Sequence, residues 1–225
     1  MNPLLHPVLR AAVPGILQAN AWATEDGPEC AKREPRWREF YREHIRIWAP
    51  GVYSMPYLAP GACRRLRLRC DELGYEPNAD EEPEAQINEC VLSERDPELF
   101  TALNGAWVGV MPAIANLLLQ LEVKSCLSIQ GAVYSPDGTA GTAWHQDIDS
   151  EFTAVVALSD PKSFVGGGTD VYRSMETHRV PPLPVGHAMI FAGRTTLHRG
   201  VEVEAGKRHL LVHWCNQQLS NLNMH

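Results

Sequence analysis

Thr142-Ala143-Trp144-His145-Gln146-Asp147 is the stretch that decides the fold of this chain, together with the later segment Leu197-His198-Arg199-Gly200. A His and an Asp separated by one residue point to the same face of a strand, because side chains alternate between the two faces. A second strand that brings His198 beside them would place two imidazoles and one carboxylate on one side of a metal ion. This ligand set suits Fe(II) and leaves the opposite coordination positions open to O2. The two segments therefore predict a non-haem iron site of the oxygenase type.

Arg208, ten residues after His198, adds a second feature of such a site. A 2-oxo acid that chelates the iron needs a permanently charged donor for its far carboxylate, and a planar guanidinium binds a carboxylate through two parallel hydrogen bonds. The even spacing would let His198 and Arg208 face the same interior, although Gly200 and Gly206 indicate a turn between them. The spacing is consistent with a 2-oxo acid site and does not establish one alone.

The C-terminal half of the chain resembles the prolyl and lysyl hydroxylase branch of the Fe(II)/2-oxoglutarate dioxygenases. The resemblance rests on His145-Gln146-Asp147, Phe164-Val165-Gly166-Gly167-Gly168-Thr169, His198-Arg199-Gly200 and the run from Lys207-Arg208 to Trp214. It implies an iron ion on three ligands: His145, Asp147 and His198. It also implies that Arg208 holds 2-oxoglutarate, that Tyr134 contacts this cosubstrate and that Trp214 lines the same pocket.

By this resemblance we expect hydroxylation of an unactivated C–H bond in a prolyl or lysyl side chain of a peptide or protein. 2-Oxoglutarate would be decarboxylated to succinate, with O2 as the oxidant and ascorbate as a candidate reductant. Related halogenases lack the carboxylate ligand, so Asp147 favours hydroxylation. Two alternatives stay open: the substrate is a free amino acid or natural-product intermediate, or the chain is a non-catalytic sensor that binds metal and 2-oxoglutarate.

The 225 residues, 44% of them hydrophobic, suffice for one domain with a full core. We expect a helical extension over residues 1–50 packed on a dioxygenase domain over residues 51–225, as one structural unit. The net charge of −7 argues against a dedicated nucleic-acid binder, whose affinity rests on basic surface. No stretch has the apolar length of a membrane span, and prolines interrupt the N-terminus where a secretory signal is continuously apolar. We therefore expect a cytoplasmic protein without membrane contacts.

Apolar periodicity predicts three helices and a series of short strands. The helices are expected over residues 35–48, 60–74 and 97–121, with Gly105, Gly109 and Pro112 indicating a bend or split in the third. Strands are expected over 52–58 and 124–134, and near 142–147, 151–159, 169–173, 187–192 and 207–215. Residues 1–34 show no clear period and are interpreted as short helices or a mobile arm. The pattern indicates an α+β fold, mainly β, with a double-stranded β-helix (jelly-roll) core braced by N-terminal helices.

Several other polar features have simpler interpretations. Asp149 rivals Asp147 as a ligand, but the His-x-Asp register favours Asp147. His209 and His213 lie at odd spacing from Arg208 and should face away from it on a regular strand. The glycines at 166–168 lack the Lys and Ser or Thr of a phosphate loop and are interpreted as a tight connection. The six scattered cysteines are expected to be free thiols.

The polar segment 76–96 is interpreted as a solvated loop, with a lid over the active site as the alternative. Its acidic run, Asp80, Glu81, Glu82 and Glu84, would favour a cationic substrate if the segment is a lid. Asn88-Glu89 resembles a polar pair on the strand that flanks the cleft in related bacterial enzymes. Because Cys90 stands in place of their more usual basic residue, we assign this pair no role.

Overall fold

The computed structural model describes residues 2–77 and 86–216. The acidic run that was expected as a solvated loop or a lid lies outside these residues.

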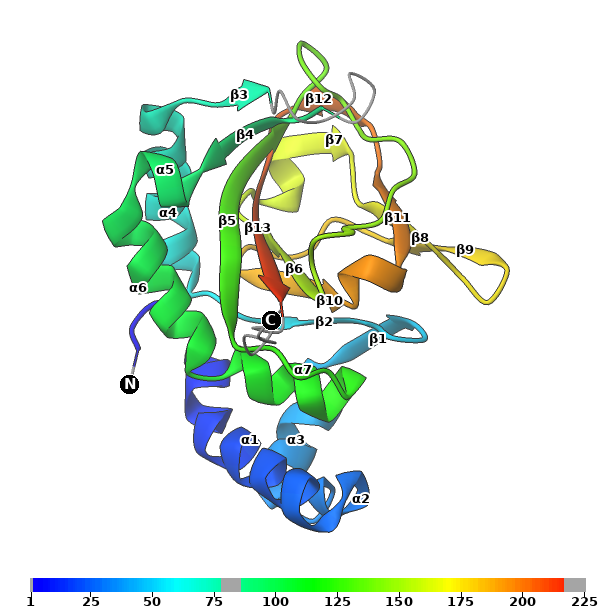
Figure 1. Ribbon diagram of the computed structural model, residues 1–225. Coiled ribbons are helices and arrows are strands. Elements are labelled where there is room, and N and C mark those ends of the chain that lie inside the picture. Colours follow the sequence, from blue (N-terminus) through cyan, green and yellow to red (C-terminus); the bar gives the residue numbers. More distant parts are fainter. Residues whose placement is uncertain (1, 78–85, 217–225) are drawn as a thin grey trace, which may run out of the picture.

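The β core consists of one large antiparallel sheet and two small ones (Figure 1). The large sheet has the order β1-β2-β10-β6-β13-β5-β4-β3. Its strands are β1 (Arg46–Ala49), β2 (Val52–Pro56), β3 (Glu76–Pro77), β4 (Asn88–Val91), β5 (Ser125–Tyr134), β6 (Phe152–Ala157), β10 (His187–Phe191) and β13 (Arg208–Asn216). The small sheets are β11-β8-β9 and β12-β7, made of β7 (Phe164–Gly166), β8 (Thr169–Arg173), β9 (Glu176–Val180), β11 (Leu197–Gly200) and β12 (Val203–Gly206). The predicted mainly β, jelly-roll fold is confirmed.

Helices cover the face of the large sheet that points away from the small sheets (Figure 1). They are α1 (Pro7–Asp26), α2 (Pro28–Ala31), α3 (Pro35–His44), α4 (Pro60–Leu73), α5 (Leu92–Arg95), α6 (Pro97–Val108) and α7 (Met111–Leu119). Helix α4 begins with Pro60 and ends before Gly74, whose φ of 85° suits glycine, as predicted. The apolar residues of this face share one buried core with α1 and α3.

The alternation along β13 decides which side chains face which layer. Arg208 pairs with Tyr134 of β5, and Trp214 pairs with Ser128, so the even-numbered residues of β13 point into the space between the sheets. The odd-numbered ones point toward the helices, where the His213 ring stacks on Trp107 of α6 with ring centroids 5.1 Å apart. His209 and His213 therefore face away from Arg208, as predicted.

Two helix predictions need correction, and a third is confirmed. Residues 7–26 form one long helix rather than short helices or a mobile arm, and Pro14 lies inside it. The helix predicted over 35–48 ends at His44, and Trp48 belongs to β1. The bend or split predicted in the helix over 97–121 is confirmed, because this segment forms two helices, α6 and α7, with a 47° bend between them. Among the described residues no single helix is long and apolar enough to cross a membrane, although α6 and α7 together pass that test by length and composition.

The strand predicted near 142–147 is also wrong. His145 makes one isolated bridge to His198, and the chain around it is otherwise irregular. The reason is a turn: the Ser150 amide donates to the Asp147 carbonyl at 2.9 Å, and the Asp147 amide donates to Gly193 at 3.2 Å rather than to a strand. The predicted strands at 52–58, 124–134, 151–159, 169–173, 187–192 and 207–215 are confirmed within a few residues.

Candidate metal centre

Two of the predicted ligands are joined through their own backbones. The His145 amide donates to the His198 carbonyl at 2.9 Å, and the His198 amide donates back to the His145 carbonyl at 2.9 Å. His198 lies in β11, which pairs with β8 beside it. The irregular segment that carries His145 and Asp147 is therefore attached to a strand at the point where the ligands meet.

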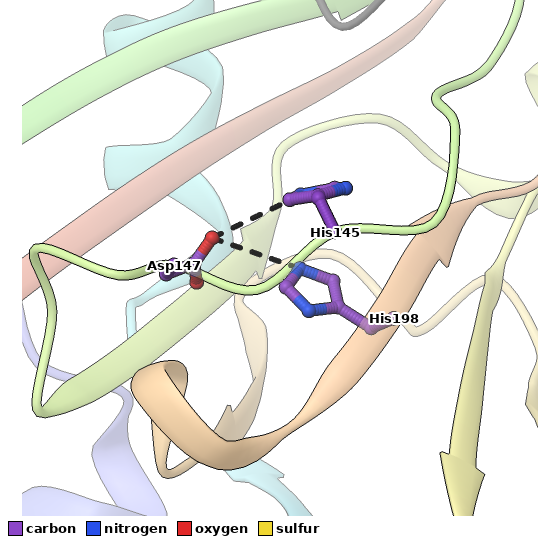
Figure 2. Close-up of side chains that lie close together, drawn as sticks. All are labelled: His145, Asp147 and His198. Carbon is purple, nitrogen blue, oxygen red and sulfur yellow. Dashed lines mark ion pairs between the residues drawn. The ribbon is translucent and has the colours of Figure 1, made fainter.

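The three ligand atoms lie close together, as Figure 2 shows. Asp147 Oδ1 is 3.8 Å from His145 Nε2 and 3.8 Å from His198 Nε2. The two imidazole centroids are 4.3 Å apart, and one donor atom from each of the three residues lies within 4.8 Å of the others. In the described part of the chain this is the one such group of His, Cys, Asp or Glu that could hold a metal.

The atoms behind the ligands aim the donors at a common point. Nδ1 of His145 lies 2.9 Å from the Ala143 carbonyl, and Nδ1 of His198 lies 3.0 Å from the Thr196 carbonyl. Because a carbonyl oxygen accepts, each Nδ1 carries the proton, which leaves the lone pair on Nε2. Burial lowers the pKa of His198, which favours the same neutral form.

The carboxylate is oriented in the same way. Thr153 Oγ1 donates to Asp147 Oδ2 at 2.6 Å, which leaves Oδ1 directed toward the two imidazoles. Asp147 is 8% exposed and Thr153 is 1% exposed, so water does not compete for this hydrogen bond. Two neutral imidazoles and one oriented carboxylate fit a first-row divalent metal, and this donor set with open positions is typical of non-haem Fe(II) sites.

The ligands open into a cavity of about 500 Å³ between the sheets. Arg208 lies in its wall, 7% exposed, and its Nη1 donates to the Gly168 carbonyl at 2.8 Å. Its guanidinium carbon is 5.7 Å from the centre of the Tyr134 ring. Burial lowers the pKa of Arg208 because these neighbours leave its charge uncompensated. A buried guanidinium facing a cavity suits an anionic ligand, and a carboxylate matches its fork.

All the predicted site residues line this one cavity: His145, Asp147, His198, Arg208, Tyr134 and Trp214. Their contacts with metal and cosubstrate remain predictions. Asp149, the rival ligand, is exposed at the cavity wall and is outside the ligand group. The three glycines at 166–168 all have positive φ, from 72° to 97°, and form the expected tight connection between β7 and β8.

No site role was predicted for three further polar residues of the cavity: Glu89, Gln130 and Thr153. Thr153, the second residue of β6, donates a hydrogen bond to Asp147, six residues before it, and no periodicity of the sequence reveals this contact. Glu89 belongs to the pair that was assigned no role, and the structure places it in the wall of the cavity. Alternation alone could have placed Gln130 on the face of Tyr134, four residues further along β5.

A charged network on the outer face of β11 and β8 supports the segment before His145. Asp170, 2% exposed, accepts from Arg199 Nε at 3.1 Å and from Arg179. Burial opposes ionisation of Asp170, but the hydrogen bonds from these two guanidinium groups lower its pKa overall. The Arg199 guanidinium also lies 4.9 Å from the centre of the Trp144 ring. Trp144, the neighbour of His145, is thus held against β11.

Comparisons with known proteins agree with this geometry. No family model matches the chain. A PKHD-type hydroxylase of Prochlorococcus marinus is 28% identical over 120 residues, which cover 50% of this chain and 53% of the relative. The chain thus matches about half the length of this curated relative.

Several solved structures share the fold. A Pseudomonas putida prolyl-4-hydroxylase matches with a TM-score of 0.57 and 18% identity, over 80% of this chain and 96% of that one. A Trichoplax adhaerens prolyl hydroxylase, solved with a peptide fragment of hypoxia inducible factor, matches with a TM-score of 0.59 and 13% identity, over 92% and 91%. The α-ketoglutarate-dependent carbocyclase SnoK of nogalamycin biosynthesis matches with a TM-score of 0.55 and 21% identity, over 80% and 82%.

The chain shares the jelly-roll fold of solved 2-oxoglutarate–Fe(II) oxygenases, and its ligand group of two His and one Asp could hold a metal ion. Its resemblance to the prolyl hydroxylase-like branch of that class is confirmed by these neighbours and by the PKHD-type relative. The solved neighbours include a carbocyclase, so the fold alone does not fix the reaction.

Proposed function

We propose that this protein is an Fe(II)- and 2-oxoglutarate-dependent dioxygenase that hydroxylates an unactivated C–H bond of an amino-acid side chain. The observation that carries the proposal is the combination of the His145, Asp147 and His198 ligand group with buried Arg208 in the wall of one cavity. A metal site alone would suit many reactions. The added guanidinium matches a cosubstrate that carries a second carboxylate.

Each residue of the site has a defined task in this proposal. His145, Asp147 and His198 would hold Fe(II), which supplies the activation of O2 together with oxidative decarboxylation of 2-oxoglutarate. Arg208 would bind the far carboxylate of 2-oxoglutarate, and the Tyr134 ring beside it would limit the positions open to that carboxylate. Trp214 and Val212 lie further along the same face of β13 and would exclude water from the reacting carbon.

The decisive experiment follows succinate formation. The protein is loaded with Fe(II) under anaerobic conditions, 2-oxoglutarate is added, and succinate is measured after O2 is admitted, with and without candidate substrates. We expect His145→Ala and Arg208→Ala to lower the rate at least 100-fold. His44→Ala serves as the matched control, because His44 is exposed on α3 outside the cavity. Full turnover in Asp147→Ala without an added ligand would exclude the proposal.

The substrate has two candidate forms. The prolyl hydroxylase neighbours, one of them solved with a peptide, favour a residue within a peptide or protein. The carbocyclase SnoK, which comes from nogalamycin biosynthesis, favours the alternative of a small molecule such as a natural-product intermediate or a free amino acid. Mass spectrometry distinguishes them, because the true substrate gains one oxygen atom only when Fe(II) and 2-oxoglutarate are both present. Metal and 2-oxoglutarate binding without turnover on any candidate would favour a sensor.

A further inference from the structure

Arg208 is the first residue of β13, and regular strand pairing holds it from one side. It pairs with Tyr134 of β5, whereas the pairing of β13 with β6 begins two residues later, at Leu210. One further main-chain hydrogen bond on the β6 side runs from the Leu158 amide to the His209 carbonyl at 3.0 Å. The residue proposed to bind the cosubstrate therefore lies just beyond the end of a ladder, where a strand frays unless another group secures it.

The Ser159 side chain secures the strand at this point. The chain leaves β6 after Ala157, and the His209 amide donates to Ser159 Oγ at 2.8 Å, in the place where an antiparallel ladder would offer a carbonyl. Ser159 Oγ also lies 3.1 Å from Nδ1 of the His209 ring and 3.4 Å from the Lys207 carbonyl. Ser159 is 3% exposed, so water does not replace these contacts. One hydroxyl thus contacts the residues on both sides of Arg208.

The His209 ring is held from its other side by helix α4. Its Nε2 lies 3.2 Å from Oδ1 of Asp71, and the Tyr75 hydroxyl donates to the same carboxylate oxygen at 3.1 Å. Burial lowers the pKa of His209, so the ring is neutral and carries one proton. Since a carboxylate only accepts, that proton lies on Nε2, and Nδ1 accepts from the Ser159 hydroxyl. Ser159, His209 and Asp71 therefore form one hydrogen-bonded chain in which each bond donates toward Asp71.

This chain fixes the direction in which Arg208 points. Side chains alternate along β13, so a His209 ring held toward α4 directs the Arg208 side chain to the opposite face, into the cavity. There Arg208 Nη1 donates to the Gly168 carbonyl at 2.8 Å. A guanidinium binds a carboxylate through two parallel hydrogen bonds, and a small misplacement of such a group is costly. The position of the main chain at residue 208 therefore decides how well the guanidinium meets its ligand.

We infer that Ser159, His209 and Asp71 are positioning residues that aim the guanidinium of Arg208 at the far carboxylate of 2-oxoglutarate. None of the three lines the cavity that contains the metal ligands, so they act through Arg208. The inference rests on the proposed function, because it concerns the residue that would bind the cosubstrate. Loss of the chain should weaken binding of the far carboxylate and leave metal chelation by the other end of the molecule unchanged.

The test separates the two ends of the cosubstrate. 2-Oxopentanoate keeps the 2-oxo acid group that chelates a metal and carries a methyl group where 2-oxoglutarate carries its far carboxylate. Binding of both acids to the Fe(II)-loaded protein is measured by calorimetry without O2. The ratio of the two dissociation constants reports the contribution of the far carboxylate, whereas a general structural defect would weaken both acids and leave this ratio unchanged.

We expect the wild type to prefer 2-oxoglutarate and Ser159→Ala to reduce that preference roughly 3- to 10-fold, the effect of about one hydrogen bond. Ser159→Thr keeps the hydroxyl and should retain most of the preference. Asp71→Ala, at an exposed position where folding is less at risk, should also reduce it, and Asp71→Asn, which still accepts from Nε2, should reduce it less. Glu72→Ala removes the neighbouring exposed carboxylate of α4 and is the matched control, which should keep the preference.

The variant Arg208→Ala tests whether the chain acts through Arg208. In that background Ser159→Ala should change the ratio by less than about twofold, because the residue that it positions is gone. The inference is overturned if Ser159→Ala and Asp71→Ala both keep the wild-type ratio, whether or not overall binding weakens. A ratio that falls in Arg208→Ala but in neither of these variants leaves the proposed function standing. Equal binding of the two acids by the wild type, including no binding of either, would count against both the proposed function and the inference.

Discussion

Replacing Thr153 by Val should weaken metal binding while preserving the fold. Val has nearly the shape of Thr, so Thr153→Val removes the hydroxyl that donates to Asp147 Oδ2 at 2.6 Å, together with its 3.0 Å contact with Ser150 Oγ. A hydrogen bond to a charged group contributes about 1.5–3 kcal/mol. Loss of an outer-shell partner typically lowers metal affinity 10- to 100-fold, which corresponds to about 1.4–2.7 kcal/mol. The two estimates agree, and we expect a loss of affinity in this range.

The assay is a titration of the metal-free protein with Fe(II) under anaerobic conditions, repeated with Co(II), whose visible absorption reports its coordination. Thr153→Ser keeps the hydroxyl and should recover most of the affinity. Thr101→Val is the matched control, because the Thr101 hydroxyl is exposed and donates to a helix carbonyl. A dissociation constant in Thr153→Val within twofold of the wild type would refute the reasoning that Thr153 orients the carboxylate.

Three further predictions concern the cosubstrate, the core and the outer network. Arg208→Lys keeps the charge but loses the planar fork, so the KM for 2-oxoglutarate in succinate assays should rise at least tenfold, and an unchanged KM would contradict the assignment. Burial lowers the pKa of His213 to about 3, so stability is full above the ordinary value of 6.5 and falls as the pH falls toward 3, by roughly 3 kcal/mol at pH 4. Urea titrations measure how much the free energy of unfolding falls between pH 7 and pH 4. This fall should be smaller in His213→Phe than in the wild type by about that amount, and equal falls would argue against a neutral buried imidazole. Arg199→Met removes the contacts with Asp170 and Trp144 and should lower the free energy of unfolding by about 1–2 kcal/mol, because Arg199 is partly exposed and Asp170 keeps its other partner; no change would show that the network is dispensable.

The ligand set was predictable because its spacing is specific, but the reason given for it was only partly right. Alternation on a strand was expected to align His145 with Asp147. In the structure a bridge to His198 and a turn after Asp147 bring the two side chains together. The three metal ligands could be predicted because His and Asp are the residue types that bind Fe(II). The backbone that presents them depends on a strand more than fifty residues away, which local pattern does not contain.

Alternation did succeed on β13, where a regular strand pairs on both sides. It placed Arg208 and Trp214 on one face and His213 on the other. Glu89 was compared to a residue on a strand that flanks the cleft but was given no role. Its place in the cavity wall depends on the register that sets β4 beside β5, which the local sequence pattern does not contain.

The N-terminal helix escaped prediction because its buried face is built from small residues. Its buried positions include Ala12, Gly15 and Ala19, which give a weak apolar period. Gly15 is needed for close approach, since a Cβ there would lie 2.5 Å from the Cβ of Arg36 on α3. Pro14, inside the helix, adds a signal that normally ends one. The close packing of α1 against α3 thus requires small residues, and these give a sequence pattern that resembles a loop.

The reciprocal amide–carbonyl pair between His145 and His198 uses main-chain atoms alone. Any residue except proline can make these two hydrogen bonds. The backbone therefore holds positions 145 and 198 side by side whatever side chains they carry. Substitution at either position changes the donor set, while both main-chain hydrogen bonds can still form. The ligand side chains of this fold can therefore be exchanged one at a time while the backbone arrangement around them stays the same.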